Sequence, residues 1–196
     1  MDRMTQEYLQ SELSIQLGTK RNIEDLIHAI DAANCEVRDA DLILAKIHLP
    51  VATSPLSVDL VICTPEELGF KNGTDFRSLC NQARKQGLDL CPPEVAFQLC
   101  LQYNHYQLGE RLTIVTEGIA VSRGAMVSCQ VGRDYGGRVW LGLTWENPEI
   151  ICCPRRRFIF RQRLFYATKY NSAEKIEPAA HISHVGHEHH FLDNHR

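Results

Sequence analysis

The chain of 196 residues is 44% hydrophobic and 23% charged, which is ordinary for a soluble globular protein. The N-terminal residues 1–8 are polar and lack the apolar region of a secretory signal. No run approaches the ~20 consecutive apolar residues that a membrane-spanning helix needs. We therefore expect a cytoplasmic protein with no membrane partner, built as one globular domain over residues 12–170.

The two terminal segments differ from this domain in their pattern. Residues 1–11 are predicted to be a short N-terminal extension, and residues 171–196 a flexible tail, because the tail is rich in histidine and has no apolar periodicity. Charge is also uneven, with a net −7 over residues 1–120 and +4 over residues 121–196. This asymmetry would steer an acidic partner toward the C-terminal half.

The cysteines and histidines do not form a metal-binding pattern. No C-x-x-C pair occurs, and without an export signal we expect reduced, buried thiols. The tail histidines lack a supporting shell and indicate only loose metal binding. We expect neither a metal site nor a cofactor. The cysteines are residues 35, 63, 80, 91, 100, 129, 152 and 153, and the tail histidines are residues 181, 184, 187, 189, 190 and 195.

The N-terminal half alternates strands and helices. Alternating apolar residues predict a strand over 13–17, and Asn22 is a suitable N-cap for a helix over 23–34. A shorter helix is expected over 39–47, and the apolar run 58–63 has the length of a buried strand. A third helix is predicted to start after Thr74 and to end before Gly87. Its inward residues are Phe76, Leu79, Cys80 and Ala83.

The segment 97–103 alternates apolar and polar residues with period two. This predicts a strand that folds back at 104–109 to pair with 110–119, because one register then gives an apolar face and a mostly polar face. A helix is the alternative, because Val95, Leu99 and Tyr103 also lie four residues apart.

A second hairpin is predicted from strands at 126–131 and 138–144, followed by a final strand with Phe158 and Phe160 facing inward. This order of elements indicates an α+β fold. We expect a predominantly antiparallel sheet built from C-terminal hairpins, with about three helices from the N-terminal half packed on one face. A closed, barrel-like sheet is the alternative.

Several short motifs resemble a family of uncharacterised bacterial proteins. They are E-L-G-F at 67–70, G-L-D-L-C-P at 87–92, E-V at 94–95, L-Q-Y at 101–103 and G-E at 109–110. The resemblance covers roughly residues 13–160 and implies no known activity. Two departures matter: Cys100 stands where the family usually has Arg, and Ala96-Phe97 where it usually has Gly-Pro.

A polar group on the predicted hairpin is the first candidate ligand-binding site. Polar side chains on a rigid hairpin face make a reasonable binding surface. The competing interpretation is structural, because Glu94 fits a helix-capping position and a Gln–Arg cross-strand pair is common. The candidate residues are Glu94, Gln98, Gln102, Arg111 and Glu117.

No complete catalytic motif is present, so we expect an uncharacterised intracellular bacterial protein that binds a protein or a small molecule. The alternative is an enzyme, a hydrolase or a transferase, using Glu94 or Glu117 for acid–base chemistry.

The last predicted strand carries a row of arginines at Arg155, Arg157, Arg161 and Arg163. One interpretation is a charged edge strand that resists pairing with other sheets. The other is a basic surface for phosphate groups, which adds nucleic acid as a possible but not favoured partner.

Overall fold

A computed structural model describes residues 9, 13–38, 50–116, 126–146 and 150–163, without the side chains of residues 126, 127, 145 and 146. The predicted second helix at 39–47, Glu117 and the tail lie outside the described residues. So does the N-terminal extension, except residue 9.

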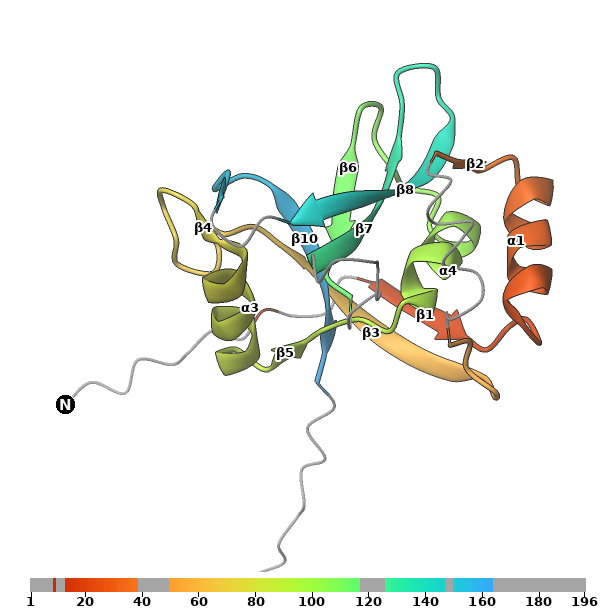
Figure 1. Cartoon of the computed structure of the whole chain (residues 1–196), viewed down its shortest axis with the longest axis horizontal. Helices are drawn as coiled ribbons and strands as arrows, with labels where there is room; N and C mark the ends of the chain where they lie inside the picture. Colours follow the sequence, from red (N-terminus) through yellow and green to blue (C-terminus); the bar gives the residue numbers. More distant parts are fainter. Residues whose placement is uncertain (1–8, 10–12, 39–49, 117–125, 147–149, 164–196) are drawn as a thin grey trace, which may run out of the picture. The chain divides into compact units, whose positions relative to one another are not determined.

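The strands form a large mixed sheet and a small two-stranded one (Figure 1). The order in the large sheet is β1-β3-β10-β6-β7-β8-β2, with β5 also pairing with β10. The pairs β10–β6 and β2–β8 are parallel and the others antiparallel. The strands are β1 (Leu13–Leu17), β2 (Glu36–Val37), β3 (Leu56–Cys63), β4 (Thr74–Asp75), β5 (Leu88–Asp89), β6 (Arg111–Ile114), β7 (Met126–Arg133), β8 (Val139–Glu146), β9 (Ile151–Cys152) and β10 (Arg157–Gln162).

The α+β class is therefore confirmed, but two details of the expected sheet are wrong. The sheet is mixed, and strands from along the whole described chain build it. Only β7 and β8 form the hairpin predicted at the C-terminal end. The neighbours of β10 are distant in sequence, so hairpin signals between adjacent segments could not reveal its pairing.

Helices α1 (Ile23–Ala32) and α3 (Phe76–Lys85) agree with the sequence prediction. The side chain of Asn22 accepts a hydrogen bond from the Asp25 N–H at 2.8 Å, as an N-cap does. For α3 the N-cap is Asp75 rather than Thr74, and its carboxylate accepts from the Ser78 N–H at 2.9 Å. Both helices thus begin at a side chain that satisfies an otherwise unpaired amide.

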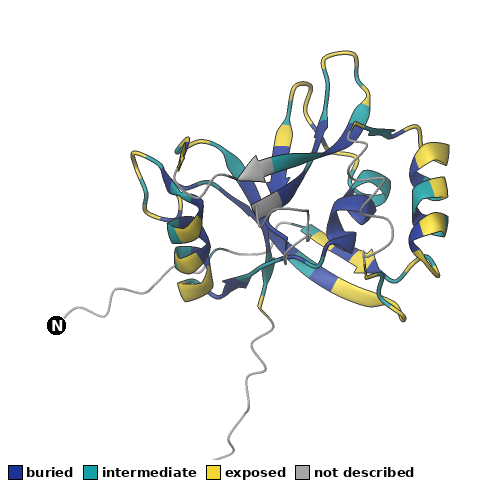
Figure 2. Cartoon of the chain, in the orientation of Figure 1, coloured by how far each residue is buried: buried dark blue, intermediate teal, exposed yellow. Residues whose placement is uncertain are grey.

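The predicted strand 97–103 is wrong, because the chain forms helix α4 (Glu94–Gln102) there. The run 94–99 is buried without interruption, including Glu94 and Gln98 (Figure 2). When polar and apolar side chains of a helix are all buried, the sequence shows no polar stripe with a period of 3.6 residues. The chance alternation of period two then favoured a strand.

Helices cover both faces of the sheet, not one as expected. Along β3, Leu60 and Ile62 pack in the same cluster as α1 and α4, whereas Val61 and Cys63 pack with α3. Successive strand residues point to opposite faces, so the two clusters lie on opposite sides. Figure 1 shows α1 and α4 at one end of the molecule and α3 at the other.

Strand β10 lies inside the sheet, between β3 and β6. Phe158, Ile159 and Phe160 are all fully buried. The interpretation of this segment as a charged edge strand is therefore wrong, because its backbone is paired on both sides.

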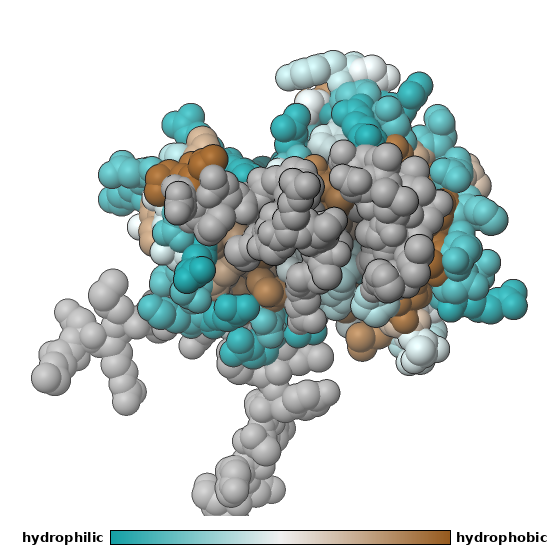
Figure 3. Space-filling model, in the orientation of Figure 1, coloured by the Kyte–Doolittle hydropathy of each residue, from teal (hydrophilic) through white to brown (hydrophobic). Residues whose placement is uncertain are grey.

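The outer surfaces of α1 and α3 are mostly hydrophilic in the space-filling view (Figure 3). Ile151 of β9 and the preceding Ile150 are exposed. Within the described residues, no helix is long and apolar enough to cross a membrane.

Candidate functional site

Three of the five candidate residues lie together on α4, four residues apart. The carboxylate of Glu94 is buried and accepts hydrogen bonds from the Gly18 N–H at 2.8 Å and the Ala52 N–H at 2.7 Å. Gly18 has φ +67, and a side chain there would collide with the Ser54 carbonyl. The glycine thus lets this loop pack directly against the backbone at residues 52–54.

Gln98 and Gln102 continue this row of hydrogen bonds along the helix. The Gln98 amide donates to Glu94 Oε1 at 2.8 Å and to the Thr19 hydroxyl at 2.8 Å. The Gln102 amide donates to Gln98 Oε1 at 2.7 Å. It also pairs with the backbone of Gln16, accepting from its N–H at 2.9 Å and donating to its carbonyl at 2.7 Å.

We call Glu94, Gln98 and Gln102 the helix ladder. Its polar atoms bind the backbone of β1, the backbone amides of Gly18 and Ala52 and the hydroxyl of Thr19, so it fastens α4 to the sheet. Gln102 also forms hydrogen bonds with the backbone of Gln16 in β1. In the described sheet β1 pairs only with β3, so these bonds satisfy backbone groups at an edge strand. The structural interpretation of these residues therefore has geometric support, because both oxygens of Glu94 accept hydrogen bonds from the protein and the side chain is buried.

The other two members of the predicted set are not part of the ladder. Arg111 begins β6 and is exposed, with its guanidinium 5.6 Å from the centre of the Trp140 ring. Glu117 lies outside the described residues. The structure thus separates Arg111 from the glutamines that were expected to face it.

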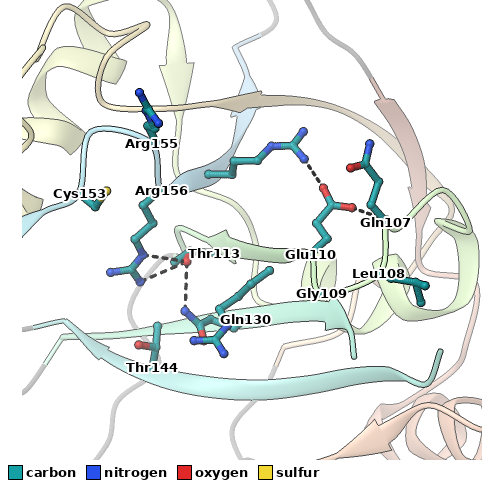
Figure 4. Close-up of a pocket in the computed structure, with 12 residues that line it drawn as sticks. Gln107, Leu108, Gly109, Glu110, Thr113, Gln130, Thr144, Cys153, Arg155 and Arg156 are labelled. Carbon is teal, nitrogen blue, oxygen red and sulfur yellow. Dashed lines mark hydrogen bonds and ion pairs between the residues drawn. The ribbon is translucent and has the colours of Figure 1, made fainter. Parts of the chain in front are cut away.

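Arg111 is among the lining residues of a pocket of about 740 Å³, on the sheet face opposite the core cluster of α1 and α4. Figure 4 shows this pocket. Thr113 of β6, Gln130 of β7 and Thr144 of β8 lie on its floor. The core residues Leu112, Cys129 and Leu143 alternate with them and pack on the opposite face. The remaining lining residues are Gln107, Leu108, Gly109, Glu110, Cys153, Arg155, Arg156 and Arg157.

The wall of this pocket is the turn that enters β10. The Arg156 N–H donates to the Cys153 carbonyl at 3.0 Å, which closes the turn. The parallel pairing of Arg157 with Leu112 then places the arginines of the turn beside β6. We call Arg111, Arg155, Arg156 and Arg157, with the floor they surround, the arginine pocket.

Two of the four arginines are held in place by pocket residues. The guanidinium of Arg156 donates to the Thr113 hydroxyl oxygen from Nε at 3.2 Å and from Nη2 at 3.1 Å. It also lies 4.9 Å from the centre of the Phe158 ring. Arg157 forms an ion pair with Glu110, whose other oxygen accepts from the Gln107 N–H at 2.7 Å. These contacts fix both side chains before any ligand arrives.

The other two arginines have no carboxylate partner among the described residues. Arg155 and Arg111 are both exposed, and the Arg111 guanidinium lies over the ring of Trp140. Glu110 is the one carboxylate among the described lining residues and is already paired with Arg157. The described lining residues of the arginine pocket therefore carry a net positive charge, which attracts anions.

The predicted row of four arginines at residues 155–163 is split in two. Arg155 and Arg157 lie at the arginine pocket, whereas Arg161 and Arg163 lie near Asp89 of β5, at 3.4 Å and 3.8 Å from its carboxylate. Sequence reasoning missed Arg156, Thr113 and Gln130 as pocket residues. The charge excess of the segment pointed to Arg156, but only the pairing of β6, β7 and β10 could identify the floor.

No group of three or more potential metal-ligating side chains occurs in the described part of the chain. Cys153 lines the arginine pocket and is exposed, and no second sulfur accompanies it in the lining.

Comparisons of the chain with family models, curated proteins and solved structures gave no match, so the arguments for function rest on this geometry.

Proposed function

We propose that this protein binds a small anionic molecule, carrying phosphate or carboxylate groups, in the arginine pocket. The observation that supports this proposal is the presence of four guanidinium groups and one carboxylate around a single cavity. Guanidinium groups present paired N–H donors that match the oxygens of phosphates and carboxylates.

The size and lining of the cavity also favour a small ligand. A volume of about 740 Å³ lies within the ~300–1,000 Å³ range of small-molecule sites. Gln130 supplies an uncharged polar group on a rigid sheet, and Arg156 is already oriented by the buried hydroxyl of Thr113. A site on paired strands keeps its geometry without ordering loops on binding, so little affinity is lost to conformational entropy.

The two alternative functions have less support in the geometry. A nucleic-acid strand would use a continuous row of cations, but Arg161 and Arg163 lie near Asp89, away from the pocket. An enzyme using Glu94 would need a carboxylate that can reach substrate, and both oxygens of Glu94 bind the protein backbone.

Calorimetric titration of the full chain with inorganic pyrophosphate and with citrate tests this proposal. We expect binding of at least one probe, weakening as salt rises because chloride and screening compete with it. The double variant R111Q/R155Q should weaken binding by about a hundredfold or more, since each of the two lost charge-assisted contacts contributes roughly 1.5–3 kcal/mol.

A matched control is R84Q. Arg84 is exposed on α3 and is not among the lining residues of the arginine pocket. The R84Q variant should bind the probe with the same affinity as the unmodified chain. Equal binding by R111Q/R155Q and R84Q, or no binding of either probe at low salt, would contradict the proposal.

A further inference from the structure

The floor of the arginine pocket indicates what the ligand contains besides its anionic group. A cavity of about 740 Å³ has room for a molecule with several carbon atoms. Part of such a molecule would contact the floor of the pocket rather than its arginines. The polar and apolar groups of the floor therefore select among small anions.

Two side chains on the floor have polar atoms that the protein does not use. Gln130 donates from its amide nitrogen to the Thr113 hydroxyl at 3.3 Å, and its amide oxygen accepts no hydrogen bond from the described residues. The hydroxyl of Thr144 likewise has no hydrogen-bond partner in the described part of the chain. An amide oxygen accepts hydrogen bonds, and a hydroxyl both donates and accepts them. The floor thus offers an acceptor and a donor to a bound molecule.

The sheet holds these two groups at a fixed spacing. In the β7–β8 pair Gln130 lies opposite Gly142, and Thr144 is its diagonal neighbour on the same face, so the two residues are roughly 7–8 Å apart. Gly142 has no side chain that would fill the space next to the Gln130 amide. Figure 4 shows both polar side chains at the pocket. One small molecule can therefore reach both groups.

The aromatic rings next to the pocket do not favour a ligand with a flat apolar ring. Phe158 is completely buried, and the Arg156 guanidinium lies 4.9 Å from the centre of its ring. The centre of the Trp140 ring has the guanidinium of Arg38 at 4.7 Å and that of Arg111 at 5.6 Å. A guanidinium over a ring occupies the face on which a ligand ring would stack.

The described lining also provides little aliphatic surface. Leu108 is the one aliphatic side chain among those lining residues. Tyr135 is exposed and lies against Gly109, but it is not itself in the described lining. Because the hydrophobic effect scales with the apolar area removed from water, an apolar group would gain little here. The lining therefore fits a hydroxylated molecule better than an aromatic one.

The charge of the described lining favours a phosphate as the anionic group. A phosphate monoester carries about −1.5 to −2 charges at pH 7 and three strong acceptor oxygens, whereas a carboxylate carries one charge and two oxygens. Four guanidinium groups and one carboxylate surround the cavity, and the guanidinium groups of Arg111 and Arg155 are exposed. A single phosphate can therefore accept hydrogen bonds from more than one arginine.

From the unused polar groups of the floor, the scarce apolar lining and the arginines, we propose that the ligand of the arginine pocket is a sugar phosphate. Its phosphate binds Arg111 and Arg155, and its hydroxyl groups bind Gln130 and Thr144. This inference rests on the proposed function, because it specifies the ligand of the same site.

Calorimetric titration of the full chain with four phosphate monoesters tests this proposal. The probes are ribose 5-phosphate, glucose 6-phosphate, methyl phosphate and phenyl phosphate, which share one phosphate group and differ in what it carries. We expect at least one sugar phosphate to bind about tenfold or more tightly than methyl phosphate, because a site that hydrogen-bonds hydroxyl groups discriminates against a molecule without them. Phenyl phosphate that binds more tightly than both sugar phosphates would overturn the proposal and indicate a ring-binding site.

The variant T144V tests the floor directly. Thr144 makes no hydrogen bond to the described residues, so its replacement by the similarly sized valine leaves the contacts of Arg156 in place. We expect T144V to weaken binding of the sugar phosphate about threefold or more, and that of methyl phosphate by less. The matched control is T53V, because Thr53 is exposed and is not among the lining residues. This control should bind every probe as the unmodified chain does.

The outcomes separate this inference from the proposed function. If methyl phosphate binds as tightly as both sugar phosphates, or if T144V weakens both kinds of probe equally, the sugar-phosphate assignment is wrong while anion binding stands. If pyrophosphate, citrate and all four monoesters fail to bind at low salt, the proposed function is contradicted and this inference is overturned with it.

Discussion

The helix ladder and the arginine pocket are both clusters of polar side chains, but they differ in where their hydrogen bonds end. Glu94 and Gln98 of the ladder are buried, and their polar atoms bind the protein's own backbone and side chains. In the arginine pocket, Arg111 and Arg155 are exposed and have no carboxylate partner among the described residues.

The difference shows how a structural polar cluster can be distinguished from a binding one. A buried polar group is tolerated when each of its atoms has an internal partner, and removing it leaves those partners unsatisfied. Like charges that surround a cavity without partners of opposite charge repel one another and do not stabilise the fold. Such groups are better explained by a ligand of opposite charge.

The largest expected effect is that of E94A on stability. Removing this carboxylate leaves the buried amides of Gly18 and Ala52 without their acceptor, so we expect a loss of about 3 kcal/mol or more in the free energy of unfolding. Urea unfolding followed by circular dichroism measures this loss.

The controls for E94A are E66A and R155Q. Glu66 and Arg155 are exposed, and R155Q removes a charge from the arginine pocket. Both variants should shift the unfolding midpoint by less than about 2 °C. A drop for R155Q as large as that for E94A would erase the distinction between the two clusters.

A smaller effect is expected for Q102A. This change removes two hydrogen bonds to the Gln16 backbone and one to Gln98, but the site is only partly buried, so water replaces some of them. We expect a loss of about 1–2 kcal/mol by thermal unfolding. Gln107 at the arginine pocket is exposed, and Q107A is the matched control with an expected change near zero. Equal stability of Q102A and Q107A would show that the ladder contributes nothing at this end.

The smallest effect concerns Asp75, which has internal partners as Glu94 does but is less buried. Hydrogen bonds from Ser78, and more weakly from Arg77, lower the pKa of Asp75 below its ordinary value of 3.8. The stabilisation is therefore present above pH 3.8 and is lost as the pH falls through the lower folded-state pKa.

Urea unfolding of the unmodified chain and of D75N, compared between pH 6 and pH 2.5, measures this contribution. Asparagine can still cap α3 but does not titrate, so the difference between the two proteins should shrink at the acid end. A difference independent of pH would mean that the charge of Asp75 contributes nothing to the cap.

The sequence alone determined the elements whose residues divide into a buried and an exposed side. Helix α1, helix α3, the β7–β8 hairpin and the strand at Phe158–Phe160 were all predicted from periodicity and capping residues. These signals are local, because a half-buried element records its own period in its sequence. The sequence also singled out Glu94, Gln98 and Gln102 as a related set, through a mistaken strand register.

Only the tertiary structure decided what those residues do. Helix α4 is buried along most of its length, so its sequence contains no polar stripe to mark it as a helix. The arginine pocket depends on β10 lying between β3 and β6, far from both in sequence. Pairing between distant segments is set by the packing of the whole sheet, and neither strand alone carries a signal for its neighbour. The arginines could therefore be recognised as a basic segment, but their division between a pocket and Asp89 could not.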